Sequence, residues 1–151
     1  MTEPVEVRIQ RLPHAPGLPA YATPGSAGLD IAAAVAADEP MELAPGARAL
    51  VPTGLRLAVP EGWEAQIRPR SGLALRHGLM LPNSPGTIDS DYRGELQVIV
   101  LNAGSEPVRI ERGMKIAQLV LHPVPRVAWL ECAELDATER GEGGFGSTGT
   151  V

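Results

Sequence analysis

Two carboxylates, an aromatic ring and an amide lie close together in one short stretch of this sequence. Asp89 and Asp91 are separated by a single residue, Tyr92 follows directly, and Asn83 lies a short way upstream. A carboxylate held on a rigid loop can act as a general base, and the ring and the amide could bind a small molecule beside it. The competing interpretation is a turn whose Asp side chains only bond their own backbone. The stretch taken alone favours this turn.

The elements that would position these residues follow from their neighbours. Turn-forming residues occupy positions 83–86, and Leu96, Val98 and Val100 recur at period-two spacing. This pattern predicts a β-hairpin or a wide turn that leads into a buried strand. In an extended segment, Asp89 and Asp91 would leave the same face.

A second stretch combines a cation, a hydroxyl and a glycine. Arg70-Ser71-Gly72 lies between a predicted strand and a short predicted helix over 73–77, which Gly78 would close. Backbone N–H groups at a helix start, beside a hydroxyl and a guanidinium, suit a phosphate group. Ser71 could equally serve only as the N-cap of that helix, and the local sequence does not separate these two interpretations.

The C-terminal stretch 140–151 is rich in glycine and contains the one phenylalanine of the chain, Phe145. It cannot bury enough apolar surface to order itself, so a flexible tail is the ordinary interpretation. It is not a P-loop, since it lacks the Gly-Lys-Ser/Thr ending. An aromatic ring among glycines instead favours a mobile lid that stacks on a flat ligand, with Arg140, Ser147 and Thr148 as phosphate partners.

Four further side chains each have two interpretations. Asp30 follows a Ser-Ala-Gly turn and could meet Mg²⁺ through water, or it could be a solvated carboxylate at a strand end. Gln118 interrupts the apolar run 116–121 and could face solvent, or donate to a ligand if it faces a cleft. Trp63 and Trp129 are expected in the core or in an interface rather than at a ligand.

Length and composition predict one globular domain. The chain has 151 residues, of which 44% are hydrophobic but only 3% aromatic, so the core must consist of Val, Leu, Ile and Ala. The 17 glycines and 15 prolines are spread between short apolar runs, which indicates many turns rather than disorder. We therefore expect residues 1–136 to form the domain and residues 137–151 to form a flexible C-terminal arm.

Short apolar runs separated by turn signals predict an all-β fold, jelly-roll-like, as a barrel or sandwich of many short strands with at most one short helix. The predicted strands cover residues 5–12, 41–43, 47–59 with a break at 52–54, 63–68, 96–101, 108–110, 116–121 and 127–135.

Charge and cysteine content exclude several classes. A net charge of −5 argues against a nucleic-acid-coating surface, although a nucleotide ligand needs only a few local arginines. The single Cys132 excludes an internal disulfide framework, and three scattered histidines offer no transition-metal cluster. No run is apolar enough to span a membrane, and the N-terminus lacks a signal-peptide profile. We expect a cytoplasmic protein.

Five stretches, in this order, resemble the five motifs of the homotrimeric dUTP diphosphatases, or dUTPases. Any one motif is a weak signal, but five in order with sensible spacing are specific, and they cover nearly the whole chain from about residue 20. The stretches are Ala22-Thr-Pro-Gly-Ser-Ala-Gly-Leu-Asp30, Arg68-Pro-Arg-Ser-Gly-Leu-Ala74, Asn83-Ser-Pro-Gly-Thr-Ile-Asp-Ser-Asp-Tyr-Arg-Gly94, Arg112-Gly-Met-Lys-Ile-Ala-Gln118 and Arg140-Gly-Glu-Gly-Gly-Phe-Gly-Ser-Thr-Gly149.

The resemblance implies a jelly-roll subunit that forms a homotrimer. Each of its three sites would combine motifs one, two and four of one chain with motif three of the next chain and motif five of the third. The implied reaction is Mg²⁺-assisted attack of water on the α-phosphate of dUTP, which gives dUMP and pyrophosphate. This reaction would limit uracil incorporation into DNA and supply dUMP for thymidylate synthesis.

The resemblance also implies a role for each matching position. Asp89 would be the general base, Asn83 would read the uracil edge, and Tyr92 would exclude a 2′-hydroxyl. Mg²⁺, held mainly by the phosphates, would meet Asp30 through water. The other substrate-binding residues would be Arg70, Ser71, Gly72 and Gln118 in the body and Arg140, Phe145, Gly146, Ser147 and Thr148 in the arm.

Two other functions remain open at this point. A dCTP deaminase has a similar fold, but it keeps a catalytic Glu after its Arg-Ser motif and its motifs differ from the five above. A non-enzymatic trimeric nucleotide-binding or regulatory module is the second. Asp89 and the intact tail argue against it, because a pure binder needs neither a base nor a lid.

Overall fold

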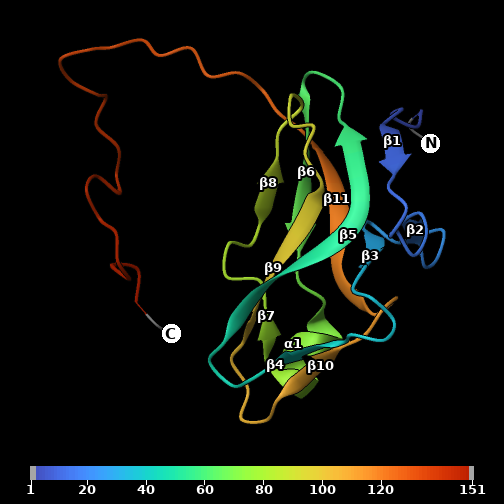
Figure 1. Ribbon diagram of the computed structural model, residues 1–151. Coiled ribbons are helices and arrows are strands. Elements are labelled where there is room, and N and C mark those ends of the chain that lie inside the picture. The colour runs from blue at the N-terminus through green and yellow to red at the C-terminus, as the bar shows by residue number, and fades with distance from the viewer. Residues whose placement is uncertain (1–2, 150–151) are drawn as a thin grey trace.

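The computed structural model describes residues 3–149 and builds them mainly into short strands, arranged in two facing layers (Figure 1). In chain order the elements are β1 (Arg8–Arg11), β2 (Ala20–Tyr21), β3 (Leu29–Ala32), β4 (Met41–Leu43), β5 (Arg48–Ala58), β6 (Trp63–Arg68), α1 (Ser71–His77), β7 (Leu79–Met80), β8 (Gly86–Ile88), β9 (Leu96–Asn102), β10 (Val108–Ile110) and β11 (Lys115–Pro123).

The strands pair antiparallel in three sheets. One sheet has the order β1-β5-β9-β7, a second has the order β2-β3-β11-β6-β8, and β10 pairs with β4. Because the two larger sheets face one another, the side chains that alternate inward from each meet in a common core. The predicted all-β fold with at most one short helix is therefore confirmed for the described residues.

The core is aliphatic, as the low aromatic content predicts. Ile31 and Ile116 enter it from the five-stranded sheet, and Val51 and Val98 enter it from the four-stranded sheet, all with at most 1% of their surface exposed. Each such side chain stabilises the fold by about 1.5–3 kcal/mol. Trp63 packs partly buried against this core, whereas Trp129 is 91% exposed and does not belong to it.

The one helix of the described residues, α1, ends at His77 as the sequence predicts, but it begins at Ser71, two residues before the predicted start at Leu73. Its last turn closes on Gly78, whose left-handed φ of 66° lets its N–H bond the carbonyl of Ala74. A residue without a Cβ adopts this conformation at little cost, so glycine ends the helix at His77.

The segment between β8 and β9 is a wide turn, and the hairpin alternative is wrong. β8 pairs with β6 in one sheet, while β9 pairs with β5 and β7 in the other. The segment 89–95 therefore crosses between the two sheets. The backbone N–H of Tyr92 bonds the carbonyl of Asp89 at 3.2 Å. This turn removes the extended geometry that would put Asp89 and Asp91 on one face.

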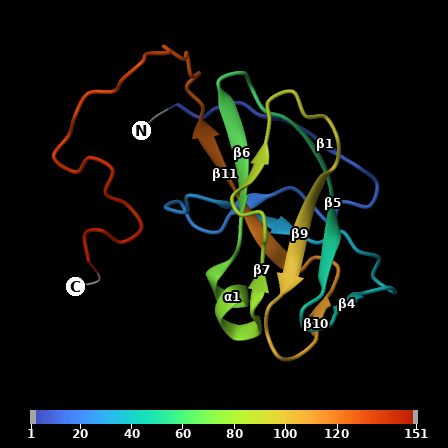
Figure 2. The ribbon, with the colours of Figure 1, turned by 90° about the vertical axis from the view of Figure 1, so that its left-hand side faces the viewer.

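Two other strand predictions are corrected. β5 runs without a break, and its pairing with β9 shifts register between Pro52 and Leu55 instead, which accommodates the missing N–H of the proline as a bulge. No strand forms over 127–135 within the described chain, because no other strand lies beside this segment to supply hydrogen bonds. Beyond Arg126 the chain extends away from both sheets (Figures 1 and 2). Residues 150–151 of the predicted arm lie outside the described part.

Candidate functional site

One cleft of about 360 Å³ collects residues from three of the recognised stretches. It lies between the turn before β3, the start of α1 and strand β11. The predicted site residues that line it are Asp30, Arg70, Ser71, Gly72 and Gln118. The structure thus brings together the residues predicted to hold the phosphate chain and Mg²⁺.

Strand pairing explains why Gln118 faces this cleft. β11 lies between β3 and β6, so Gln118 stands opposite Asp30 on one side and opposite Arg68 on the other. Its side-chain amide donates to the carbonyl of Pro69 at 3.0 Å. A Cβ on Gly28 would lie 2.5 Å from its Oε1, so this side-chain position requires a glycine at 28.

The helix start leaves donors free for a ligand. The N-cap is Arg70, in extended conformation and without a side-chain capping bond, and Ser71 is the first helical residue. The alternative of Ser71 as the N-cap is therefore wrong. Because no side chain caps this end, the first backbone N–H groups of α1 beside the Ser71 hydroxyl remain available to an anion.

The charges around the cleft favour an anionic ligand. Asp30 is only 17% exposed and pairs with Arg70 Nε at 3.3 Å and with Lys115 Nζ at 2.8 Å. Arg70 Nη1 also donates to the carbonyl of Lys115 at 3.1 Å, which fixes the guanidinium beside the helix start. Arg76, one helical turn after Gly72, lines the same cleft. Two cations thus pair with Asp30, and a third, Arg76, lines the same cleft.

Sequence reasoning missed Arg76 and Lys115. Arg76 follows Gly72 by four residues, and this helical spacing puts both on one face of α1. This spacing in the sequence could have identified Arg76 as a site residue. Lys115 belongs to the fourth stretch, but nothing in the sequence indicates its contact with Asp30 across two strands.

Asp89 lies in a different cleft, of about 910 Å³. This cleft is lined by Trp63 and Glu64 at the start of β6 and by residues of the 89–95 turn, including Arg93. Arg70 follows the other end of β6. Six strand residues span roughly 20 Å, so one chain holds Asp89 far from the phosphate cleft. Figures 1 and 2 agree, since the turn between β8 and β9 and helix α1 lie at opposite ends of the molecule.

Asn83 precedes the turn that carries Asp89, Tyr92 lies within that turn, and both side chains are exposed. A Cβ on Gly86 would lie 3.2 Å from Asn83 Nδ2, so the amide rests closely over β8. A Cβ on Gly94 would collide with the phenol ring of Tyr92, whose hydroxyl donates to the carbonyl of Glu95 at 3.0 Å. Glycines at 86 and 94 therefore set the positions of both side chains.

Glu95 ends this turn and has a perturbed pKa. Partial burial acts to raise the pKa of Glu95, but hydrogen bonds from His14 and from the Gly54 N–H outweigh it. The pKa consequently lies below its ordinary value of 4.5, and the carboxyl group is an anion at neutral pH.

The described arm residues, 137–149, line neither cleft. The hydrogen bonds of the described arm are local, such as those from Gly143 N–H to Arg140 O and from Ser147 N–H to Gly144 O, both near 3 Å. Phe145 is fully exposed. The predicted site residues on this segment are Arg140, Phe145, Gly146, Ser147 and Thr148.

Residues 3–149 contain no group of three or more His, Cys, Asp or Glu side chains arranged to hold a metal ion. In the same part of the chain, no helix is both long enough and apolar enough to cross a membrane.

Comparison with known proteins gives consistent matches. The family model for dUTPases matches residues 16–149. The deoxyuridine 5'-triphosphate nucleotidohydrolase of Rhizobium meliloti (strain 1021) is 58% identical over 142 residues, which are 93% of this chain and 89% of that protein.

Solved structures agree with the fold. The dUTPase of Staphylococcus bacteriophage 80alpha with dUPNHPP has a TM-score of 0.86 and 27% identity, and the match covers 96% of this chain and 99% of that one. A mutant dUTPase from phage phi11 of S. aureus, described with a structural Mg(II) ion, has a TM-score of 0.77 and 23% identity over 86% of this chain and 98% of that one.

Proposed function

The chain belongs to the dUTPase family, and we propose that it acts as a homotrimer in which each site is assembled from three subunits. Its reaction is the hydrolysis of dUTP to dUMP. One observation carries the proposal: a single chain separates the phosphate cleft, the Asp89 turn and the arm from one another. Neighbouring copies would supply the missing parts to each site.

The phosphate cleft of one subunit would bind the triphosphate. Arg70 and Arg76 offer guanidinium groups, and Ser71 and the free N–H groups at the start of α1 offer short-range donors. The carboxamide of Gln118 would donate to a phosphate oxygen after exchanging its bond to Pro69. The surplus of positive charge favours the binding of an anionic triphosphate.

The donor set fits Mg²⁺ that is held by phosphates rather than by the protein. Asp30 is the one carboxylate lining this cleft among the described residues, and it is already paired with Arg70 and Lys115. It would orient a water of the metal shell rather than bind the ion directly, since Mg²⁺ keeps most of its waters. When bound, Mg²⁺ neutralises phosphate charge that otherwise repels the nucleophile.

The Asp89 turn of the next subunit would supply the base. The carboxylate of Asp89 is exposed on a turn fixed at both ends by strands of different sheets. It would orient a water toward the α-phosphorus and accept its proton as the P–O bond forms. Pyrophosphate then leaves as the bond to the β-phosphate oxygen breaks.

Selection of the base and the sugar would use the same segment. Asn83 and backbone groups near Gly86 would pair with the uracil edge, and a cytosine would leave buried donors and acceptors unpaired. The backbone at Gly86 would lie so close to the base that the methyl group of thymine would not fit. Tyr92 would pack under the deoxyribose and leave no room for a 2′-hydroxyl.

These assignments predict narrow selectivity. Pyrophosphate release from dUTP should exceed release from dCTP, dTTP and UTP by at least roughly 100-fold in kcat/KM, because each competitor either clashes or leaves polar groups unpaired. A coupled pyrophosphate assay with Mg²⁺ measures all four substrates. Comparable kcat/KM for dUTP, dCTP and dTTP would refute the assigned roles of the 83–94 segment, and ammonia release from dCTP would indicate a deaminase.

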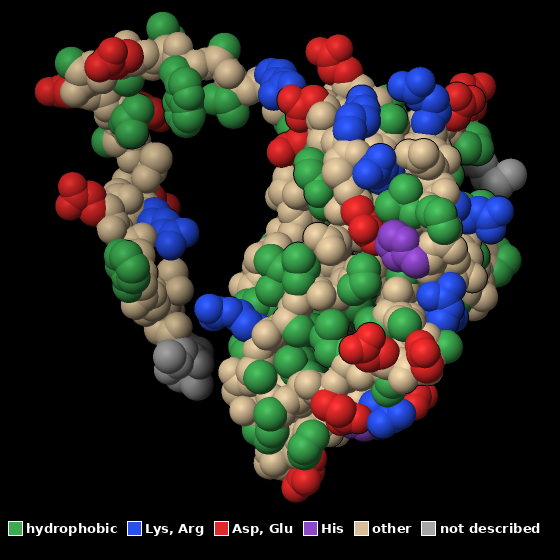
Figure 3. All heavy atoms as spheres, viewed as in Figure 1, with side chains coloured by type: hydrophobic (Ala, Val, Ile, Leu, Met, Phe, Trp, Pro, Cys, Tyr) green, Lys and Arg blue, Asp and Glu red, His purple; other side chains and the backbone are tan. Residues whose placement is uncertain are grey.

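An apolar sheet face supports the homotrimer. Val51, Val98 and Val100 point into the core, so the residues that alternate with them point outward. Figure 3 shows hydrophobic side chains gathered on this side of the molecule. Leu50 is 50% and Met80 is 45% exposed here. The apolar part of the outward face consists of Leu50, Pro52, Met80, Ile99 and Leu101, and the exposed Arg48 and Gln97 lie beside it as the strand partners of Leu101 and Pro52.

Replacing Leu50 by arginine should weaken the trimer. Leu50 is paired with Ile99, so a guanidinium at this position would be buried without a partner in the assembled face, at a cost of at least about 2 kcal/mol per subunit. Sedimentation equilibrium should give the mass of three chains for the wild type and of fewer chains for Leu50→Arg. Leu75→Arg, on an 88% exposed residue of α1, is the control and should keep the wild-type mass. An unchanged mass in Leu50→Arg would exclude this face.

The arm would complete the site from the third subunit. Phe145 would stack on uracil, and Arg140, Ser147 and Thr148 would bind the γ-phosphate end, with Gly146 allowing the turn between them at a φ of 86°. The apolar residues of 127–135, including Trp129, would then pack on a neighbouring subunit instead of facing water. Closure of the arm would remove water from the reacting groups.

The proposed setting is the cytoplasm. Cys132, the single cysteine, is free and exposed, as is usual in a reducing compartment. There the enzyme would limit uracil incorporation into DNA and supply dUMP for thymidylate synthesis. The proposal includes no nucleic-acid or membrane partner.

A further inference from the structure

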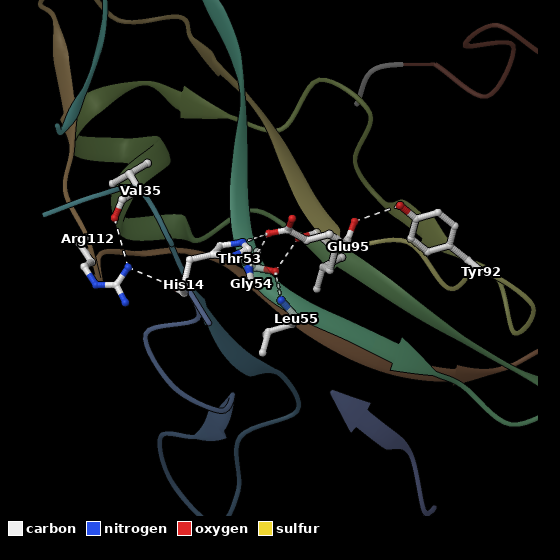
Figure 4. A network of polar contacts seen from close by, with 9 residues as sticks. His14, Val35, Thr53, Gly54, Leu55, Tyr92, Glu95 and Arg112 are labelled. Atoms are coloured by element: carbon white, nitrogen blue, oxygen red, sulfur yellow. Dashed lines mark hydrogen bonds and ion pairs between the residues drawn. The ribbon is translucent and has the colours of Figure 1, made fainter. Parts of the chain in front are cut away.

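The far end of the Asp89 turn is fixed to the body by one carboxylate. Oε1 of Glu95 lies 2.7 Å from His14 Nε2 and accepts the Gly54 N–H at 2.8 Å (Figure 4). Glu95 comes directly before β9, so these two bonds hold the point at which the turn rejoins the four-stranded sheet.

The bulge in β5 provides a backbone N–H group that binds this carboxylate. Where the β5–β9 register shifts, the N–H of Gly54 is directed to Glu95 rather than to a β9 carbonyl. Thr53, fully buried beside it, donates its hydroxyl to the carbonyl of Leu96 at 2.5 Å. A carboxylate and a hydroxyl thus replace the ladder hydrogen bonds that the bulge interrupts.

The histidine side of the contact is fixed as well. Ala15 lies so close to Gly54 that a Cβ there would come within 2.5 Å of its backbone, and the N–H of Leu12 bonds the Gly54 carbonyl at 2.8 Å. Nη1 of Arg112 donates to the carbonyl of His14 at 2.9 Å. The backbone around His14 is therefore held on both sides.

The turn itself is tied to Glu95. The hydroxyl of Tyr92 donates to the carbonyl of Glu95 at 3.0 Å, and Nη1 of Arg93 donates to the carbonyls of Ser90 and Tyr92 at 2.6 and 2.9 Å. These bonds make 89–95 one unit. Its orientation depends on Glu95, because the tyrosine hydroxyl is bonded to the peptide group of that residue.

We propose that Glu95, held by His14 and the Gly54 amide, is a positioning residue that sets the Tyr92 ring and thereby the preference for deoxyribose over ribose. The inference rests on the proposed role of Tyr92 at the sugar. A released Glu95 would let the ring shift away from the 2′ position. UTP would then be excluded less well, even though no group that touches the substrate has been removed.

The first test is the ratio of kcat/KM for dUTP to kcat/KM for UTP. Glu95→Ala should lower this ratio by roughly tenfold or more, because a small displacement of a positioned group costs that much. Glu95→Gln should restore most of it, since its amide oxygen still accepts the Gly54 N–H. His14→Ala should lower the ratio less than Glu95→Ala. Glu42→Ala, which removes the surface pair with Arg109 at 3.0 Å, is the matched control and should leave the ratio unchanged.

The second test observes the position of the Tyr92 ring directly. It does not depend on the proposed role of Tyr92 at the sugar. The chain has two tyrosines, so fluorotyrosine-labelled protein gives two ¹⁹F resonances, which Tyr21→Phe assigns. Glu95→Ala should shift the Tyr92 resonance in the folded trimer, and Glu95→Gln should not. An unshifted resonance in Glu95→Ala would overturn the proposal.

The two tests separate this inference from the proposed function. If Tyr92→Ala leaves the dUTP-to-UTP ratio unchanged, the sugar role of Tyr92 is wrong, and with it the effect on selectivity assigned here to Glu95. If Tyr92→Ala changes the ratio but Glu95→Ala does not, the proposed function stands and the positioning role of Glu95 is wrong.

Discussion

Asp89→Asn is expected to lower kcat for dUTP hydrolysis by roughly 10³-fold, the usual contribution of a general base. The amide keeps the size and the hydrogen-bonding shape of the carboxylate but cannot take the proton of the attacking water. Asp89 is exposed at the edge of its cleft, so its replacement should not disturb the core. A pyrophosphate assay measures turnover, and calorimetry with a non-hydrolysable dUTP analogue measures binding, which should be retained.

Asp91→Asn is the matched control for this result. Asp91 is an exposed carboxylate on the same turn, two residues after Asp89, and lines the same cleft. A general effect of charge on the turn would reduce kcat in both variants, whereas a base at 89 predicts a large loss in Asp89→Asn alone. Unchanged turnover in Asp89→Asn would remove the residue from the mechanism.

Removal of residues 137–151 should lower kcat by about 100-fold or more while the trimer stays intact. In the described chain these residues make only local hydrogen bonds, so their loss should not change the fold of the body. Without them the site would stay open to water and lose the groups proposed for uracil and the γ-phosphate. Steady-state kinetics and sedimentation on the same preparation measure both properties.

A single substitution separates stacking from the rest of the arm. Phe145→Ala should show part of the loss in kcat that truncation causes. Phe145→Trp should keep kcat near the wild-type value, because either aromatic ring can stack on a base. Full activity in the truncated chain would show that the arm is not part of the site.

Strand and helix positions were predictable where short-range signals decide them. β4, β6 and β10 match the predicted ranges residue for residue, since each is a short alternating run bounded by proline or glycine turns. The helix was predictable because Gly78 sets its end. The very short β2 and β7 were not predicted, since strands of two residues carry no period.

Long-range pairing could not be predicted in the same way. The residues of 83–96 suit a hairpin and a crossing turn equally well. Which one forms depends on β6 and β5, distant strands that offer free edges in different sheets. The apolar run at 127–135 has the composition of a strand, but a strand needs a neighbour, and one chain supplies none within the described residues.

The sequence predicted which residues form the candidate site more fully than it predicted how these residues are arranged in space. Asp30, Arg70 and Gln118 do share a cleft, because β11 pairs with β3 and β6 on its two sides. The distance between this cleft and Asp89 follows only from the structure. The contacts of His14 and Lys115 were also absent from the sequence patterns, since each joins residues about 80 positions apart in the chain. The roles of the individual site residues remain predictions.

Subunit mixing tests the shared site most directly. Asp89→Asn chains and chains lacking 137–151 are unfolded together in equal amounts and refolded, and pyrophosphate release from dUTP is compared with that of each variant refolded alone. If motif three and the arm of each site come from different subunits, about a quarter of the sites combine an intact Asp89 with an intact arm, and about a quarter of wild-type activity returns. If both come from the same chain, no site is complete and the mixture stays as inactive as its components, which would contradict the three-subunit site.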